Sequence, residues 1–188
     1  MNLPIRINTP ISRGVSTRLK AGDRVLISGR IFAARDAAHK RMIEALECGE
    51  ELPVPLHNEI IYYVGPTPAQ PGLAVGSAGP TTSARMDAYV PKLLEYGLLG
   101  MIGKGDRSDL VIEAMKKNDA VYFAATGGAG ALLAKHIKKY TVLAYPELGA
   151  EALAELEVED FPVIVAIDSE GKNIYRTGPL NYARQIEF

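Results

Sequence analysis

The chain has 188 residues, of which 47% are hydrophobic, and its 21 lysines and arginines nearly balance its 22 aspartates and glutamates. This length suits one domain over residues 1–188, and the balanced charge favours neither a nucleic acid nor a membrane surface as partner. No apolar run is long enough to span a bilayer, and the N-terminus lacks the pattern of a signal peptide, so we expect a cytoplasmic protein. Cys48 is the only cysteine, which excludes an internal disulfide and a cysteine-rich metal site.

Strand and helix patterns alternate along the first half of the chain. Residues 24–29 (RVLISG) and 60–64 (IIYYV) are apolar runs that are typical of buried strands. Between them, residues 36–48 carry apolar side chains at helical spacing and end before a glycine. Residues 65–80 are rich in proline and glycine and predict a long loop, interrupted only by a strand-like stretch at 73–76.

The second half continues this alternation. Residues 83–96 predict a helix that Pro91 should break or kink, and Ser108 is suited to cap a helix that runs to residue 117. Another helix should follow the glycine-rich turn at 126–130 and extend to about residue 138. Strands are expected at 98–102, 120–125, 141–145 and 163–167, and a hairpin-like turn at 168–173 should lead into a last strand at 174–176.

Strands followed by helices predict an α/β layered fold. Several of the strands are apolar without alternation, which is typical of a sheet covered on both faces. The first strands and the C-terminal hairpin could equally be antiparallel. A mixed sheet is therefore expected rather than a purely parallel one.

The most informative segment is residues 75–87 (VGSAGPTTSARMD). Two glycines and a proline let its backbone approach its surroundings closely, and three hydroxyl residues then precede Arg85. Open N–H groups at the start of a helix bind anions, and an arginine one turn later can add a bidentate contact to a carboxylate or phosphate. The alternative is a helix that follows a Pro/Gly turn and is capped by Thr82 or Ser83, without any ligand.

Candidate ligand-binding residues recur just after predicted strands, where ligands gather in open α/β sheets. The segments concerned are 34–39 (ARDAAH), 79–85 (GPTTSAR), 103–105 (GKG) and 126–130 (TGGAG). Three of them hold a cation: Arg35, Arg85 or Lys104. Converging cations without a phosphate-loop motif favour a small polycarboxylate as ligand. The turn Gly127–Gly130 lacks the Lys-Ser/Thr pair of a nucleotide site, so it is either a ligand contact or only a close strand-to-helix turn.

Six short segments of this sequence, taken together, point to a known protein family. They are residues 28–39 (SGRIFAARDAAH), 65–66 (GP), 79–87 (GPTTSARMD), 100–105 (GMIGKG), 124–132 (AATGGAGAL) and 160–168 (DFPVIVAID). Between about residues 22 and 179, the chain resembles the β subunit of class I fumarase, a family of iron–sulfur fumarate and tartrate hydro-lyases. In some members this unit is the C-terminal domain of one long chain. The resemblance implies an α/β fold of the swivelling β/β/α type with a mixed sheet.

The resemblance also implies an activity, which is reversible addition of water to fumarate to give L-malate, as in the tricarboxylic acid cycle. It implies that a [4Fe–4S] cluster, acting as Lewis acid, is held by three cysteines of a partner α subunit and not by this chain. A heterotetramer of two α and two β chains is expected. A single cysteine cannot hold such a cluster, so Cys48 is expected to be structural.

By the same resemblance, Arg35, Arg85 and Lys104 bind the substrate carboxylates. Thr81, the first threonine of the Thr-Thr pair, matches the residue proposed as base toward the carbon-bound proton. A threonine hydroxyl is a weak base at neutral pH, so this role needs neighbouring cations that favour its alkoxide.

Three further residues, His39, Thr82 and Ser83, could orient these side chains without contacting the substrate themselves. Simpler alternatives stay open: Arg35 could form only a surface ion pair with Asp36, and His39 could be a buried core histidine. For the whole chain, the alternatives are a β subunit of L-tartrate dehydratase, a non-catalytic dicarboxylate-binding module and a purely structural subunit.

Overall fold

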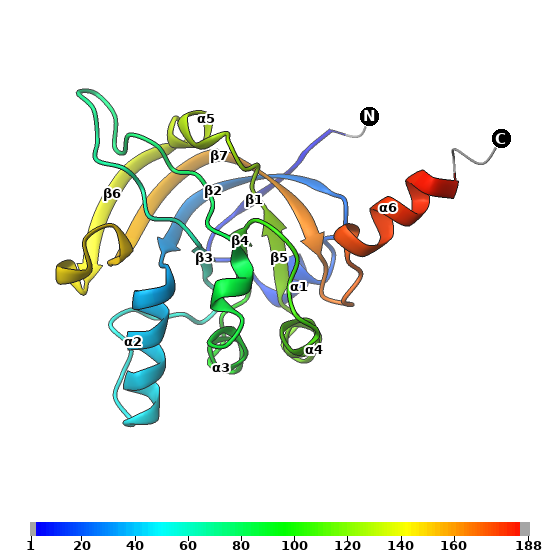
Figure 1. Ribbon diagram of the computed structural model, residues 1–188, viewed down its shortest axis with the longest axis horizontal. Helices are drawn as coiled ribbons and strands as arrows, with labels where there is room; N and C mark the ends of the chain where they lie inside the picture. Colours follow the sequence, from blue (N-terminus) through cyan, green and yellow to red (C-terminus); the bar gives the residue numbers. More distant parts are fainter. Residues whose placement is uncertain (1–2, 185–188) are drawn as a thin grey trace.

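The computed structural model describes residues 3–184, and its main feature is a seven-stranded mixed sheet that curls into a small barrel (Figure 1). The strands are β1 (Ile5–Asn8), β2 (Arg24–Ala33), β3 (Ile60–Tyr62), β4 (Gly100–Gly103), β5 (Val121–Ala124), β6 (Ile137–Ala144) and β7 (Leu153–Ile167). Their order is β1-β2-β3-β4-β5-β7-β6, and an additional pairing of β2 with β7 closes the barrel.

The strand directions place four chain segments at one end of this barrel. Strands β2, β3, β4 and β5 run parallel to one another, whereas β7 is antiparallel to β2 and to β5. The expectation of a mixed sheet is therefore confirmed. Because parallel strands end on the same side, the segments that follow Ala33, Tyr62, Gly103 and Ala124 emerge close together.

Strand β7 is much longer than the predicted strand at 163–167. It pairs with β2 along one edge, and along the other edge with β6 in its first half and β5 in its second half. Its first half alternates buried apolar and exposed acidic residues, as in Leu156-Glu157-Val158-Glu159. This alternation, rather than a continuous apolar run, is the pattern of a strand with one solvated face.

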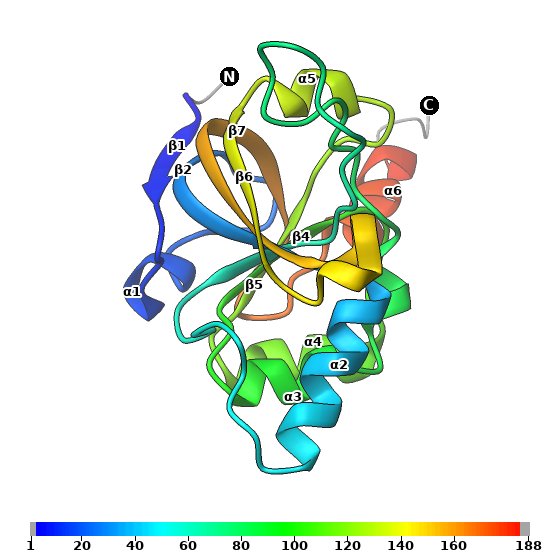
Figure 2. The same cartoon turned by 90° about the vertical axis from the view of Figure 1, so that its left-hand side faces the viewer.

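The helices lie on several sides of the barrel. They are α1 (Arg13–Ser16), α2 (Asp36–Glu47), α3 (Val90–Glu95), α4 (Asp109–Lys117), α5 (Gly130–Ala134) and α6 (Ile174–Arg184), with 3₁₀ turns η1 (Ser83–Met86) and η2 (Pro146–Glu151). Helices α2, α3 and α4 lie side by side on one face, opposite the long curved β6 and β7 (Figures 1 and 2). None of the helices within residues 3–184 has the length and apolar character needed to cross a membrane.

Several predicted elements are confirmed. Helix α2 occupies the predicted span, and Cys48 is its C-terminal cap. Cys48 is exposed, so it has no part in packing the core. Helix α4 begins where expected, with the Ser108 side chain accepting a hydrogen bond from the amide of Val111.

The interruption expected near Pro91 is confirmed, because residues 83–96 form η1 and α3, and Pro91 lies in the first turn of α3, where a missing N–H costs nothing. Other predictions are wrong at identifiable points. Helix α5 ends at Ala134 rather than near 138, since β6 begins at Ile137. Residues 174–176 start helix α6 instead of a strand. Within the described residues, no strand forms at 73–76, and β1 is a strand that the sequence patterns did not predict.

Two apolar clusters hold the fold together. One fills the barrel and contains Tyr62, Phe123 and Phe161, and the other lies between the barrel and the helices and contains Ile61 and Tyr63. Consecutive residues of β3 thus enter different clusters, so that both faces of this strand are buried. This explains why its sequence is apolar without alternation.

Candidate functional site

The candidate residues lie at the end of the barrel where β2 to β5 finish. Arg35 follows β2 and precedes α2, Thr81 and Arg85 belong to the loop after β3, and Lys104 follows β4. The turn at 126–130 follows β5 and enters α5, beside the long loop at residues 65–80 (Figure 2). Chain topology therefore brings the four segments together, as their positions after strands predict.

Two of the candidate arginines share one carboxylate. Arg85 Nε donates to Asp36 Oδ1 at 2.7 Å, and Arg35 Nε lies 3.8 Å from Asp36 Oδ2. Arg35 also reaches Glu151, with Nη2 and Oε1 3.3 Å apart. The surface ion pair of Arg35 with Asp36 is thus present, but it is part of a larger cluster in which the Arg35 side chain is only 22% exposed.

This cluster holds opposite charges in near balance and still leaves hydrogen-bond donors open. Arg85 is 51% exposed, and within the described part of the chain only its Nε has a side-chain partner. A guanidinium has five N–H donors in a planar fork, so its outer nitrogens can donate to a further carboxylate. The arrangement can therefore bind an anion at the solvent side of Asp36.

A glycine makes room for Arg35. A β-carbon on Gly65 would lie 3.0 Å from Arg35 Cδ and 2.7 Å from the carbonyl oxygen of Ala150. Neither neighbour is easily displaced, because one is backbone and the other belongs to a partly buried side chain. The glycine in the 65–66 string therefore serves close packing against the site.

Thr81 and Lys104 lie on neighbouring stretches of backbone. The amide of Thr81 donates to the carbonyl of Tyr63 at 2.7 Å, and the amide of Lys104 donates to the carbonyl of Thr81 at 3.3 Å. The next bond in this short ladder runs from the amide of Ser83 to the carbonyl of Lys104 at 2.9 Å. Thr81 is half-buried and Lys104 is exposed, so the lysine side chain is the more open to solvent of the two.

The glycine-rich turn after β5 contacts this ladder. A β-carbon on Gly127 would lie 3.7 Å from Lys104 Cδ, and the amide of Ala78 donates to the carbonyl of Gly130 at 3.0 Å. A side chain on Gly130 would overlap Ser77 Oγ. The turn is thus a place of close backbone approach that borders the lysine stem.

Thr82 and Ser83 do not cap a helix through their side chains. Thr82 occupies the position before η1 without a side-chain hydrogen bond and is exposed. Ser83 is buried, and its Oγ lies 2.8 Å from the hydroxyl of Tyr122, which donates to the carbonyl of Gly105 at 2.9 Å. Because the Tyr122 proton is used on Gly105, Ser83 is the donor in its bond to Tyr122. Ser83 therefore ties η1 to the segment after β4.

His39 is a fully buried residue of α2. Its Nδ1 lies 2.8 Å from the carbonyl oxygen of Arg35, and its ring packs edge-on against Tyr63 with centroids 5.3 Å apart. Its Nε2 has no partner among the described residues. Burial, together with the charge of Arg107, lowers the pKa of His39 to about 4, against the opposing effect of the bond to Arg35. The geometry fits a core histidine that also holds the backbone beside Arg35.

Replacing His39 with glutamine is expected to flatten the pH dependence of stability. The unfolded chain binds a proton near pH 6.5 and the folded chain only near pH 4, so acidification through this window favours unfolding. The wild-type free energy of unfolding should fall by about 2 kcal/mol between pH 7 and pH 5 from this residue alone. Urea unfolding at both pH values measures the difference. Replacing exposed His57 with glutamine serves as control and should keep the wild-type slope; an unchanged slope in the His39 variant would contradict the assignment.

Arg107 and Asp87 form a second ion pair below the site that sequence patterns do not reveal. Arg107 Nε donates to Asp87 Oδ1 at 2.7 Å, and the Arg107 side chain has no solvent exposure. Asp87 closes the 79–87 string, but Arg107 lies 20 residues away in a polar turn. A buried arginine can be recognised only from its partners, which are distant in the sequence.

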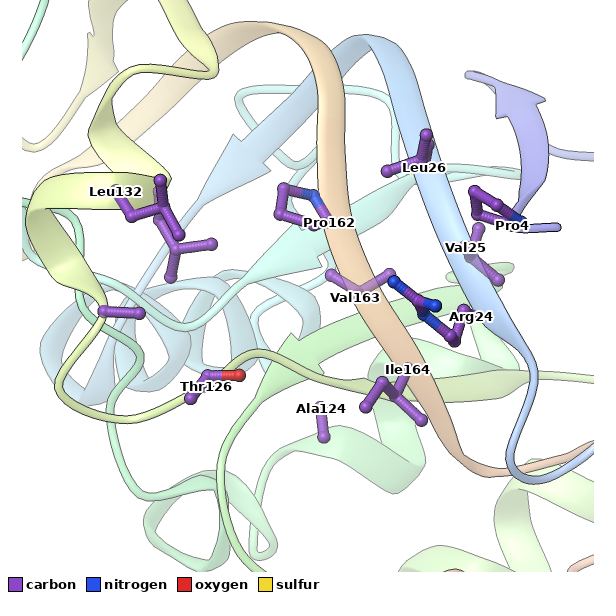
Figure 3. Close-up of a pocket in the computed structure, with 12 residues that line it drawn as sticks. Pro4, Arg24, Val25, Leu26, Ala124, Thr126, Leu132, Pro162, Val163 and Ile164 are labelled. Atoms are coloured by element: carbon purple, nitrogen blue, oxygen red, sulfur yellow. The ribbon is translucent and has the colours of Figure 1, made fainter. Parts of the chain in front are cut away.

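The structure also has a mainly apolar cavity of about 250 Å³, lined in part by Thr126 and Ala129 of the turn after β5. Figure 3 shows Leu132 of α5 on one side and Pro162, Val163 and Ile164 of β7 on the other, with Arg24 and Leu26 of β2 beyond them. None of the cations proposed to bind substrate lines it. Its lining suits packing against apolar groups rather than binding of a diacid.

Within the described residues, no group of three or more His, Cys, Asp or Glu side chains is arranged to hold a metal ion. The single thiol, Cys48, is exposed at the far end of α2, away from Arg35 at its start. The donor set of this chain therefore does not fit an iron–sulfur cluster, which needs several thiolates.

Comparison with known proteins places the chain. The sequence model described as Fumarase C-terminus matches residues 2–178. Fumarate hydratase 2 of Leishmania major is 44% identical over 156 residues, which are 82% of this chain but 28% of that protein. The aerobic class I fumarate hydratase of Escherichia coli K12 is 42% identical over 164 residues, covering 86% of this chain and 29% of that protein.

A third relative differs in its length. The putative L(+)-tartrate dehydratase subunit beta of Methanocaldococcus jannaschii is 41% identical over 164 residues, and the match covers 84% of each chain. The present chain thus spans less than a third of these two fumarate hydratases and most of the tartrate dehydratase subunit. With a family match over nearly its whole length and relatives above 40% identity, the chain belongs to the family of the fumarase C-terminus, with class I fumarate hydratases and a tartrate dehydratase β subunit among its homologues.

Proposed function

We propose that this chain is the β subunit of an iron–sulfur hydro-lyase that hydrates fumarate reversibly to L-malate. The observation that supports it most is the cluster at the barrel end, where Arg35 and Arg85 meet at Asp36 and the Thr81 backbone is bonded to that of Lys104. The family and its fumarate hydratase members agree with this reading.

The proposed chemistry needs several positive groups. Removing a proton from the carbon next to a carboxylate of malate turns that carboxylate into an aci-form with extra negative charge. Cations placed around it stabilise this transition state more than the ground state. Arg35, Arg85 and Lys104 are the residues that we assign to the two substrate carboxylates, and the open outer nitrogens of Arg85 suit a bidentate contact.

We assign the proton step to Thr81. Its backbone is held by bonds to Tyr63 and Lys104, which fixes the direction of its side chain. The neighbouring lysine and arginine charges favour the alkoxide form that a threonine base requires. In the hydration direction the same hydroxyl gives its proton to carbon, water supplies the hydroxyl group, and the remaining proton of that water restores the threonine hydroxyl, so that fumarate and one water give malate.

The [4Fe–4S] cluster is then held outside the residues of this sequence, because their donor set does not fit it. We therefore propose a partner α subunit that carries the [4Fe–4S] cluster, with two copies of each chain in the assembly and the cytoplasm as its compartment. The tartrate dehydratase relative supports separate subunits, since it is called a β subunit and has nearly the same length. The long fumarate hydratases suggest that the same parts can also share one chain.

A second candidate function is L-tartrate dehydration. The name and matching length of the M. jannaschii relative favour it. Both substrates are four-carbon dicarboxylates that lose water next to a carboxylate, so the same cations and base serve either reaction. The charged side chains around Asp36 are suited to carboxylates and do not distinguish the extra hydroxyl of tartrate.

The test is anaerobic reconstitution with the cluster-bearing chain encoded in the same genome. We expect the complex, but neither chain alone, to interconvert fumarate and malate, followed by the absorbance of fumarate. Formation of oxaloacetate from L-tartrate, with no turnover of malate, would select the second function. Tight malate binding by the isolated chain in calorimetry, with a complex inactive on both substrates, would instead indicate a binding module.

A further inference from the structure

Arg107 is buried in surroundings where the desolvation of its charge costs free energy. Its side chain has no solvent exposure, and its guanidinium lies over the rings of Tyr63 and Tyr122 at 5.4 and 5.1 Å. Its Nη1 is 3.4 Å from the Tyr63 hydroxyl and 3.5 Å from the sulfur of Met101. A well-packed apolar side chain could fill such a site at no desolvation cost. A charge in this place therefore needs a reason other than stability.

The contacts of Asp87, the partner of Arg107, supply such a reason. Asp87 accepts from Arg107 Nε through Oδ1 and from the amide of Ser108 through Oδ2 at 2.8 Å. Asp87 directly follows η1, two residues after Arg85, whereas Arg107 and Ser108 end the segment that begins with Lys104. The carboxylate thus ties the end of one candidate segment to the end of the other.

The opposite ends of the two segments are tied as well. The amide of Ser83 donates to the carbonyl of Lys104, and the buried Ser83 hydroxyl reaches Gly105 through Tyr122. A β-carbon on Gly103 would overlap Ser83 Oγ, so the Ser83 side chain packs directly against the backbone of Gly103. Tyr122 takes part in both ties, because its hydroxyl bonds to Ser83 and its ring lies against Arg107.

We propose that the buried Arg107–Asp87 pair is a positioning device that clamps η1 and the two threonines before it, Thr81 and Thr82, onto residues 103–105. The clamp sets the places of Thr81 and Arg85 relative to Lys104. Arg107 does not itself reach the substrate, since its side chain is covered on all sides. The catalytic consequence of the clamp rests on the proposed hydro-lyase function, whereas the structural consequence does not.

The first arm of the test is hydrogen exchange in the full 188-residue chain. Arg107→Met and the milder Asp87→Asn should speed exchange of the Thr81 and Ser83 amides by about tenfold or more, because their bonds to Tyr63 and Lys104 open when the clamp is lost. Ile27→Ala, a cavity-forming change in the barrel interior, is the matched control for loss of stability. In this control variant, the amides of residues 79–87 should exchange faster only to the extent that its lower global stability requires.

The second arm is kinetics of the reconstituted complex. We expect Arg107→Met to lower kcat by about 100-fold, as displacement of a reacting group by an ångström does. The KM for malate should rise less, because Arg35 lies at the start of α2, on a segment that the clamp does not hold. Arg107→Lys keeps the charge and should recover part of kcat. The Asp87→Leu/Arg107→Met double variant should be about as slow as either single one, since the two residues act as a unit.

The positioning role and the proposed function can be refuted independently of each other. Exchange at residues 79–87 that is no faster in both clamp variants than in Ile27→Ala would overturn the positioning device. Equal losses in kcat for Ile27→Ala and Arg107→Met at matched stability would do the same. A wild-type complex without hydro-lyase activity would refute the proposed function and leave the exchange measurement to decide the clamp.

Discussion

Replacing Thr81 with valine is expected to lower kcat of the reconstituted enzyme by about 10²–10⁴-fold, the usual contribution of a positioned general base. Valine keeps the shape of threonine and removes only the hydroxyl. The backbone bonds of residue 81 to Tyr63 and Lys104 do not involve the side chain, so the site geometry should remain. Initial rates of malate dehydration at saturating substrate measure the effect.

Two variants make the Thr81 result specific. Thr81→Ser keeps a hydroxyl and should retain much of the activity. Thr141→Val in β6, a matched change on another strand, should leave kcat at the wild-type value. Exchange of deuterium from solvent into the carbon next to the carboxylate should disappear with the hydroxyl. If Thr81→Val raised KM alone and kept kcat and deuterium exchange, Thr81 would be a binding residue and not the base.

Replacing Arg85 with alanine is expected to lower kcat/KM by a factor on the order of 10²–10³, similar to the loss of one oriented transition-state donor. The reason is that Arg85 is the more exposed of the two arginines at Asp36 and bonds to it through Nε, with its outer nitrogens directed to a ligand in the proposal. Steady-state kinetics with fumarate and with malate measure the loss.

The split between kcat and KM tells which role Arg85 has. A loss mainly in kcat indicates charge stabilisation in the transition state, and a loss only in KM indicates uniform binding. Arg85→Lys should be intermediate, because an ammonium keeps the charge without the bidentate fork. Arg41→Ala, which removes an exposed arginine paired with Glu147, is the control and should be near wild type. Unchanged turnover in Arg85→Ala would favour a purely structural subunit.

Local patterns predicted elements whose signals lie within one helical span. Helix α2 follows from apolar spacing and the glycine after it, and α4 from the Ser108 cap, whose side chain meets the amide three residues on. Patterns failed where pairing with distant strands decided the structure. The first half of β7 looks polar in isolation, and only β2 and β6 on its two edges make it a strand. Likewise Ile174, taken as the start of a strand, opens helix α6.

The candidate site shows the same division. Local order and composition suffice to identify the segments that carry the cations and the Thr-Thr pair, because these motif residues follow predicted strands. That Arg35 and Arg85, 50 residues apart, meet at Asp36 is seen only in the folded chain, as is the pairing of Asp87 with Arg107. An ion pair forms between residues that folding brings together, so the sequence near a charged side chain does not identify its partner. Closure of β2 onto β7 and the shared end of four parallel strands supply that proximity, and no sequence spacing encodes it.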